Sequence, residues 1–208
     1  MKKTNQAFPI GLLFILLSAI VVSCTSIPEL KIHYKLPPPL YQLEGKKVAL
    51  AIEDARGTKE FLGREARKQF QIFSENFSFR VSFHEEPGVN IGIYQVSAMM
   101  REGFRRRLEN EGLKPLFKVS PVEPRLLIVL KEFSLDLSGR NWVAKMSYEA
   151  KLIKNGKVLS NQRVSGEAER FGLAVRATAE TVTGEVFTDT VNRLDVLGLF
   201  KRAQLAVP

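Results

Sequence analysis

Short runs of alternating apolar and polar residues predict several strands in this chain. Residues 47–53 read KVALAIE, an apolar run of strand length, and turn residues at 54–57 end it. Residues 77–83 place phenylalanine or valine at every second position, which predicts a strand with one buried face. Between these strands, residues 58–76 fit either a short helix or an irregular strand.

Three longer strands are predicted in the second half of the chain. Residues 126–137 begin as a continuous apolar run and end in alternation, which is typical of a central strand near its exposed end. Alternation continues over 142–153, after turn residues at 138–141. The Asn-Gly pair at 155–156 predicts a hairpin, because both positions tolerate positive φ, and the returning strand covers about 158–169.

Two segments have the apolar spacing of helices. The first covers about 96–108, and Gly112 ends it. Its apolar face consists of Val96, Met99, Met100, Phe104 and Leu108. The second runs from about 175 to 194 and has a broad apolar face. The element order is β-α-β-β-β-α, so we predict an α+β domain over 46–208 in which two helices pack on one face of a mostly antiparallel sheet.

The start of the chain follows a different pattern. Lys2 and Lys3 precede an apolar run over 10–22, and the small residue Ser23 stands before Cys24. This order is typical of a secretory signal. An uncleaved transmembrane helix is the alternative, but the run is shorter than the roughly 20 residues that span a bilayer. Cys24 is the only cysteine, so the chain cannot form an internal disulfide.

Residues 21–24, Val-Val-Ser-Cys, resemble a bacterial lipobox. The resemblance implies that 1–23 is a signal peptide and that Cys24, the first mature residue, is acylated on its sulfur and its new amino group. Several acyl chains hold a protein firmly on a membrane. Thr25 differs from the aspartate that resembles an inner-membrane retention signal, so we predict attachment to the outer membrane, facing the periplasm. A plain cleaved signal remains an alternative.

The segment after the cysteine predicts a spacer. Residues 24–45 contain three consecutive prolines at 37–39, which favour an extended polyproline path. We therefore predict a lipidated tether over 24–45 that holds the domain away from the membrane. A docking ligand for the aromatic groove of another protein is the alternative.

Five features of the chain together resemble one known family. They are the lipobox, the strand GKKVALAIEDARG, the helix MMREGFRRRLENEGLKPL, the strand-rich run at 124–169 and the helix that contains TVTGEVFTDTVNRL. In order and spacing they resemble the YajG family of bacterial outer-membrane lipoproteins, although the segment 69–86 is longer than the family pattern. The family has no established activity, so the resemblance implies location and architecture only.

The chain offers no catalytic motif with correct spacing, so we predict a non-enzymatic protein with no cofactor and no metal. The sequence His-Glu-Glu at 84–86 contains metal-ligand types, but adjacent strand residues point to opposite faces. Asp54 and Arg56 follow the first strand and could form a site at its end. A turn stabilised by the carboxylate is the simpler interpretation.

Charge provides the remaining functional signal. The formal net charge is +9, and Arg101, Arg105, Arg106 and Arg107 lie close together on the first predicted helix. One interpretation is a solvated helix face with internal ion pairs. The other is a patch for an anionic partner, an envelope protein or anionic lipid headgroups, because arginine suits phosphate geometry. Nucleic acid is excluded as a partner, since the signal exports the chain.

We therefore predict a lipid-anchored envelope protein whose periplasmic domain binds or scaffolds an envelope partner. The alternative is an accessory lipoprotein of a lipid or lipopolysaccharide transport system, because the element order is similar to lipoproteins of such systems. That fold-level analogy cannot fix function. The alternative predicts an exposed apolar groove, which the strand at 77–83 would line.

Overall fold

A five-stranded sheet forms one side of the protein. The computed structural model describes residues 29–83, 86–118 and 122–205. The strand order of the large sheet is β5-β2-β6-β7-β8. Its strands are β2 (Lys47–Asp54), β5 (Lys114–Leu116), β6 (Arg125–Ser138), β7 (Asn141–Lys154) and β8 (Lys157–Phe171). β2 runs parallel to both of its neighbours, whereas β6, β7 and β8 are antiparallel, so the sheet is mixed.

A second, three-stranded sheet lies apart from the first. Its strands are β1 (Leu30–Leu36), β3 (Phe77–Phe83) and β4 (Val89–Tyr94), in the order β1-β3-β4. β1 pairs parallel with β3, and β3 pairs antiparallel with β4. The small sheet therefore joins the start of the described chain to a segment more than forty residues later.

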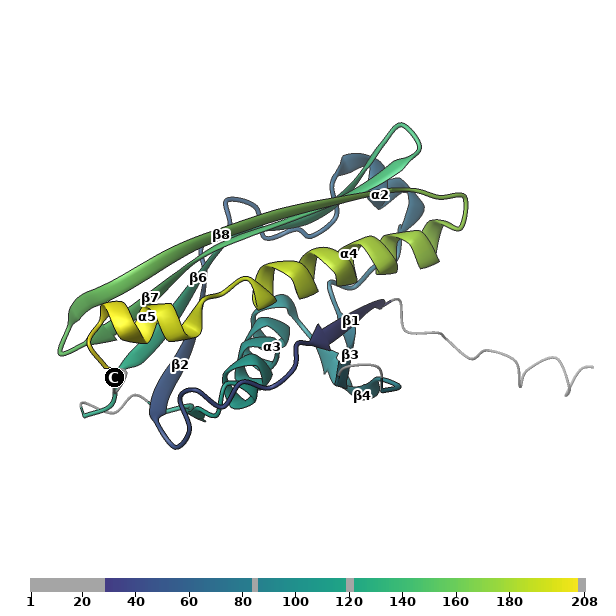
Figure 1. Cartoon of the computed structure of the whole chain (residues 1–208). Helices are drawn as coiled ribbons and strands as arrows, with labels where there is room; N and C mark the ends of the chain where they lie inside the picture. Colours follow the sequence, from purple (N-terminus) through teal and green to yellow (C-terminus); the bar gives the residue numbers. More distant parts are fainter. Residues whose placement is uncertain (1–28, 84–85, 119–121, 206–208) are drawn as a thin grey trace, which may run out of the picture.

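Four helices complete the described part of the chain. They are α2 (Arg64–Gln69), α3 (Val96–Asn110), α4 (Val175–Asn192) and α5 (Val196–Arg202). Figure 1 shows that α3, α4 and the small sheet all lie on one side of the large sheet. Within the described residues, neither of the long helices α3 and α4 covers the other face of the large sheet, as expected for antiparallel strands with one buried face.

The predicted α+β architecture is confirmed. All five apolar residues assigned to the inner face of the first predicted helix are buried in α3. The predicted hairpin turn joins β7 to β8, with φ of 51° at Asn155 and 73° at Gly156. The sequence interpretation missed β1, β4, β5 and α5. It found β3 but not the two partners that form the second sheet with it.

A bulge in β6 explains its mixed apolar pattern. Leu126, Ile128 and Leu130 are buried before the irregularity in its pairing with β7, and Phe133 and Leu135 are buried after it. An extra residue shifts the side-chain phase by one position. The bulge therefore keeps both halves of a long strand facing the same core.

An aromatic cluster connects the two sheets through α4. The ring of Phe187 lies 5.5 Å from the rings of Tyr34 and Phe79 in the small sheet and 6.3 Å from that of Phe133 in the large sheet. Gly103 of α3 leaves room for this ring, because a Cβ there would stand 2.7 Å from Phe187 Cζ. The layers therefore share one core.

The predicted tether over 24–45 is wrong for its second part. Leu30, Ile32, Tyr34 and Leu36 of β1 are all buried, and Leu43 is buried beyond the prolines. Every second residue of β1 is apolar, which buries one face against the core while the polar residues stay outside. The folded domain therefore begins at β1 rather than at residue 46.

Replacement of Ile32 by alanine tests whether β1 belongs to the domain. Ile32 is fully buried, so the lost contacts and the cavity should lower the free energy of unfolding by about 2–5 kcal/mol. Urea unfolding of the full chain measures this loss. Lys35→Ala, on the exposed face of the same strand, should change stability by less than about 0.5 kcal/mol. Equal effects of the two variants would contradict the assignment.

Candidate functional site: a groove between β1 and α4

The free edge of β1 is covered by one stripe of α4. Glu180 accepts a hydrogen bond from the Lys31 backbone N–H, 3.2 Å away, and Thr188 accepts one from that of Lys35 at the same distance. Three more contacts complete the stripe: Thr188 Oγ1 donates to the His33 carbonyl, Asn192 Nδ2 donates to the Lys35 carbonyl, and Arg176 donates to the Glu29 carbonyl. Backbone groups that an edge strand would leave open are thus paired with side chains.

The contact extends along the strand because α4 and β1 have similar repeat distances. The stripe residues stand four positions apart, at 176, 180, 184, 188 and 192, and four residues of a helix rise about 6 Å. The outward-facing residues of β1 stand two positions apart, which spans about 6.6 Å in a strand. Successive turns of α4 therefore meet successive outward residues of β1 over the whole strand.

Gly184 allows α4 to approach the backbone of β1 closely. An ideal Cβ at this buried position would stand 3.1 Å from the His33 carbonyl oxygen and 3.3 Å from its nitrogen. Both are strand backbone atoms, so neither can rotate away. The middle of the stripe carries glycine because the helix and the strand backbone touch there.

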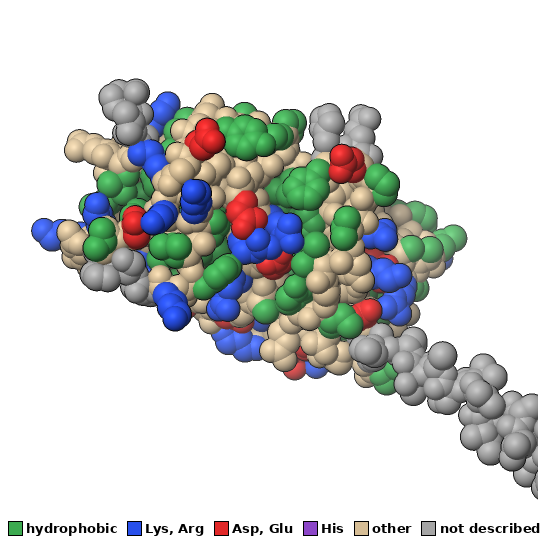
Figure 2. Space-filling model, turned by 90° about the horizontal axis from the view of Figure 1, so that it is seen from below, with side chains coloured by type: hydrophobic (Ala, Val, Ile, Leu, Met, Phe, Trp, Pro, Cys, Tyr) green, Lys and Arg blue, Asp and Glu red, His purple; other side chains and the backbone are tan. Residues whose placement is uncertain are grey.

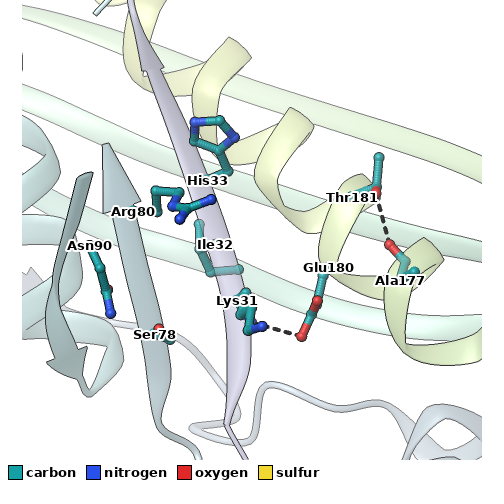
Figure 3. Close-up of a pocket in the computed structure, with 9 residues that line it drawn as sticks. All are labelled: Lys31, Ile32, His33, Ser78, Arg80, Asn90, Ala177, Glu180 and Thr181. Carbon is teal, nitrogen blue, oxygen red and sulfur yellow. Dashed lines mark hydrogen bonds between the residues drawn. The ribbon is translucent and has the colours of Figure 1, made fainter. Parts of the chain in front are cut away.

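A groove follows this helix-strand contact along the surface. It contains two adjoining cavities, of about 430 Å³ and 590 Å³, which share His33, Glu180 and Thr181. Figure 3 shows the first cavity, with Arg80 and Asn90 on the small sheet to one side of β1 and α4 to the other. Its cations come from the small sheet: Lys31, Lys35 and Arg80. Its carboxylates come from α4: Glu180, Glu185 and Asp189.

His33 occupies the centre of the groove. Its Nε2 lies 3.0 Å from Ser82 Oγ, within hydrogen-bond distance. Burial lowers the pKa of His33 below its ordinary value of 6.5, and the charges of Lys35 and Arg80 lower it further. A neutral imidazole is therefore favoured at neutral pH, and it can either donate to or accept from a ligand.

Two members of the predicted arginine patch form ion pairs on the surface of α3. Arg105 donates to Glu102 and to Glu109 over 2.8 and 2.7 Å, and Arg106 donates to Glu102 over 2.8 Å. Arg101 is exposed. Figure 2 shows the face seen from below, on which several basic side chains lie beside acidic ones. The ion-pair interpretation of this helix face therefore describes Arg105 and Arg106.

Arg107 is not part of any surface patch. It is buried, and its Nη1 lies 2.5 Å from Oε1 of Glu111, which is also buried. Among the described residues, Arg107 Nε and Glu111 Oε2 have no hydrogen-bond partner. The pair is thus enclosed and incompletely bonded, and loss of either charge would leave the other buried alone. The assignment of Arg107 to an exposed patch was wrong.

Asp54 and Arg56 form a local structural pair. The Asp54 carboxylate accepts from Arg56 Nη2 and Nε over 2.9 and 3.0 Å, and Arg56 Nη1 donates to the Phe133 carbonyl. The hydrogen bond from the Arg56 side chain lowers the pKa of Asp54 to about 2. The pair fixes the turn after β2 against β6, as the simpler interpretation of the sequence expected.

The strand β3 does not line an apolar opening. Phe77, Phe79 and Val81 are buried in the core, and only Phe83, 44 % exposed, reaches the surface. The expectation that all four apolar residues share one buried face fails at Phe83, because it stands at the strand end. The expected apolar groove is therefore absent from this strand.

Several predicted sites lie outside the described residues. Cys24 with the signal peptide, and His84 and Glu85, are among them. Within the described residues, no group of three or more histidine, cysteine, aspartate or glutamate side chains could hold a metal ion. No helix in 29–83, 86–118 or 122–205 is both long and apolar enough to cross a bilayer.

Comparison with solved structures identifies the fold. Protein XCC0632 from Xanthomonas campestris, described with the family DUF330, aligns with a TM-score of 0.54 at 14% identity, over 83% of this chain and 94% of that one. This chain shares the fold of XCC0632. At this identity the likeness concerns the fold alone. No protein-family model matches the chain, and no curated protein matches its sequence.

Two further structures show weaker likeness. Hypothetical protein CT253 from Chlamydia trachomatis gives a TM-score of 0.42 at 11% identity, over 76% of this chain and 97% of that one. The rare lipoprotein B from Shewanella oneidensis gives 0.38 at 13%, over 76% and 98%. Membership of the YajG family stays a prediction.

Replacement of Gly184 by alanine tests the contact between α4 and β1. Alanine usually stabilises a helix by about 1 kcal/mol relative to glycine. Here the added Cβ meets strand backbone, so we expect a loss of about 1–3 kcal/mol in the free energy of unfolding, measured with urea. Thr181→Ala, at an exposed position one turn earlier, should have an effect below about 0.5 kcal/mol. A stabilised Gly184→Ala variant would show that the contact is loose.

Proposed function

We propose that this chain is a lipid-anchored protein of the bacterial outer membrane that faces the periplasm and binds or scaffolds an envelope partner without catalysis. The observation that carries the proposal is the sequence at 21–24, in which the only cysteine follows an apolar run and a small residue. The structure adds that β1 begins at Leu30, six positions after Cys24. A lipidated Cys24 would therefore place the domain directly at the membrane surface.

The groove between β1 and α4 is the surface we propose for the partner. Cations line its sheet side and carboxylates line its helix side, so it suits a polar segment that carries both charges. A lipid chain would meet charged side chains on both sides of this groove. Arg101, with Arg105 and Arg106 beside it, stays a predicted second contact for an anionic partner.

The alternative function, an accessory lipoprotein of a lipid or lipopolysaccharide transport system, expects an apolar passage. The burial of Phe77 and Phe79 in the core gives this alternative no support from β3. The charges of both signs along the groove favour a protein partner, which is why we place partner binding first.

Replacement of Cys24 by alanine tests the lipid anchor. Without the thiolate no diacylglyceryl group can be attached, so the variant should accumulate as an unprocessed precursor. Incorporation of a labelled fatty acid in a Gram-negative host, together with intact mass, measures the result. Thr25→Ala keeps the cysteine and should be labelled normally. Normal labelling of Cys24→Ala would contradict the proposal.

A photoreactive amino acid at Thr181 tests the groove. Thr181 is exposed and lines both cavities, so crosslinking in living cells should yield a recurrent adduct with one envelope protein. Lys35→Glu reverses a charge in the groove and should reduce that adduct several-fold. Lys157→Glu, in the distant β7–β8 turn, serves as the matched control and should leave it unchanged. Equal effects of the two reversals would place the partner elsewhere.

A further inference from the structure

Three large apolar side chains are strongly exposed at one end of the molecule. Ile72, which follows α2, is 75 % exposed, Phe171 at the end of β8 is 63 % exposed, and Leu173 in the turn before α4 is 82 % exposed. We call these three residues the apolar tip. Large apolar side chains that are exposed at the same end of a protein often mark a surface that contacts another protein or a membrane.

Core contacts hold the apolar tip in place. The ring of Phe70, at the end of α2, packs 5.6 Å from that of Trp142, and Trp142 is paired with Arg170, the neighbour of Phe171. The Val175 backbone N–H donates to the carbonyl of Leu173, which fixes the turn before α4. The residues of the apolar tip are therefore attached to segments that pack against the core.

The described chain begins at the same end. Glu29 lines a cavity of about 270 Å³ together with Ile72 and Val175, and Arg176 donates to the Glu29 carbonyl. Figure 1 shows α2, the β8–α4 turn and the start of β1 together at the right-hand end. Ile72 of the apolar tip thus lies beside the place where the amino-terminal segment joins the domain, and the turn that carries Leu173 lies at the same end of the molecule.

The length of that segment limits where the anchor can be. Glu29 stands five positions after Cys24, and five residues span at most about 18 Å even when fully extended. If Cys24 is acylated, the membrane surface must lie within this distance of Glu29. The apolar tip then lies beside a lipid surface, because the same anchor holds the domain on the membrane.

We propose that the apolar tip enters the lipid surface next to the anchor and so fixes the orientation of the domain. This inference rests on the lipid anchor proposed above. Apolar side chains of interfacial proteins are buried about 5–10 Å into the boundary between headgroups and acyl chains. Arg140 is exposed in the turn next to Phe171. With the tip in the lipid surface, its guanidinium would lie at the level of the lipid phosphates. The β7–β8 turn, at the opposite end of β8, then points away from the membrane.

Site-specific labelling of the lipidated full chain tests the proposal. The sulfur of Cys24 is blocked once it carries lipid, so Leu173→Cys introduces the only free thiol, which is labelled with an environment-sensitive fluorophore. Val158→Cys is the matched control, since it is also exposed and lies about 40 Å away along β8. Both proteins are bound to phosphatidylethanolamine and phosphatidylglycerol vesicles that contain lipids with nitroxide quenchers on their acyl chains. Ile72→Cys provides a second tip position.

The result expected is quenching at 173 and at 72 that is several-fold stronger than at 158. A lipidated chain, verified by intact mass, with equal quenching at all three positions would overturn this inference and leave the anchor standing. A chain without the acyl mass would overturn both. A label at 173 that is shielded from aqueous iodide but not reached by the lipid quencher would mean that a protein, such as a second copy of the chain, covers the tip, which also overturns the proposal.

Discussion

The hydrogen-bonded contact between the edge of β1 and one stripe of α4 is the constraint on which the rest of the structure depends. An edge strand exposes backbone groups that either pair with another chain or must be covered. Here Glu180, Thr188 and Asn192 cover them, and Gly184 allows the helix to approach. Because β1 also pairs with β3, this contact ties the first strand, the small sheet and the last long helix into one unit.

That unit explains why both proposed surfaces lie along α4. The groove is the outer side of the contact, since its cavities are lined by the same strand and helix. The apolar tip lies at the amino-terminal end of the same helix, where Arg176 holds the backbone of Glu29. The contact therefore couples the start of the described chain to the groove, and with the lipid anchor proposed at Cys24 the domain would have only a short tether.

Local pattern was enough to predict the elements with a strong period, but not the elements that depend on distant partners. The helix α3, the three long antiparallel strands and the Asn-Gly turn follow from spacing alone. β1 also alternates, but the prolines after it suggested a spacer, and its partner β3 is remote in sequence. Arg107 shows a second limit. It lies four positions from Gly103 and from Glu111, on the buried side of α3. This spacing could have shown from the sequence that Arg107 does not belong to the surface patch. In the groove, the polar positions of α4 at every fourth residue gave a similar signal, but only the structure shows that they meet a strand edge.

The orientation inferred from the apolar tip also limits which partners can reach the groove. α4 starts at the tip, and a helix rises 1.5 Å per residue, so Asn192 stands about 24 Å farther along the axis than Arg176. With the tip in the lipid surface, the groove would run from close to the headgroups to roughly that height. A partner that fills it would then have to present a polar segment within a few nanometres of the membrane, as the extramembrane part of another membrane-bound protein does. A freely diffusing periplasmic protein would have to approach alongside the lipid surface, where the bilayer blocks half of its approach directions.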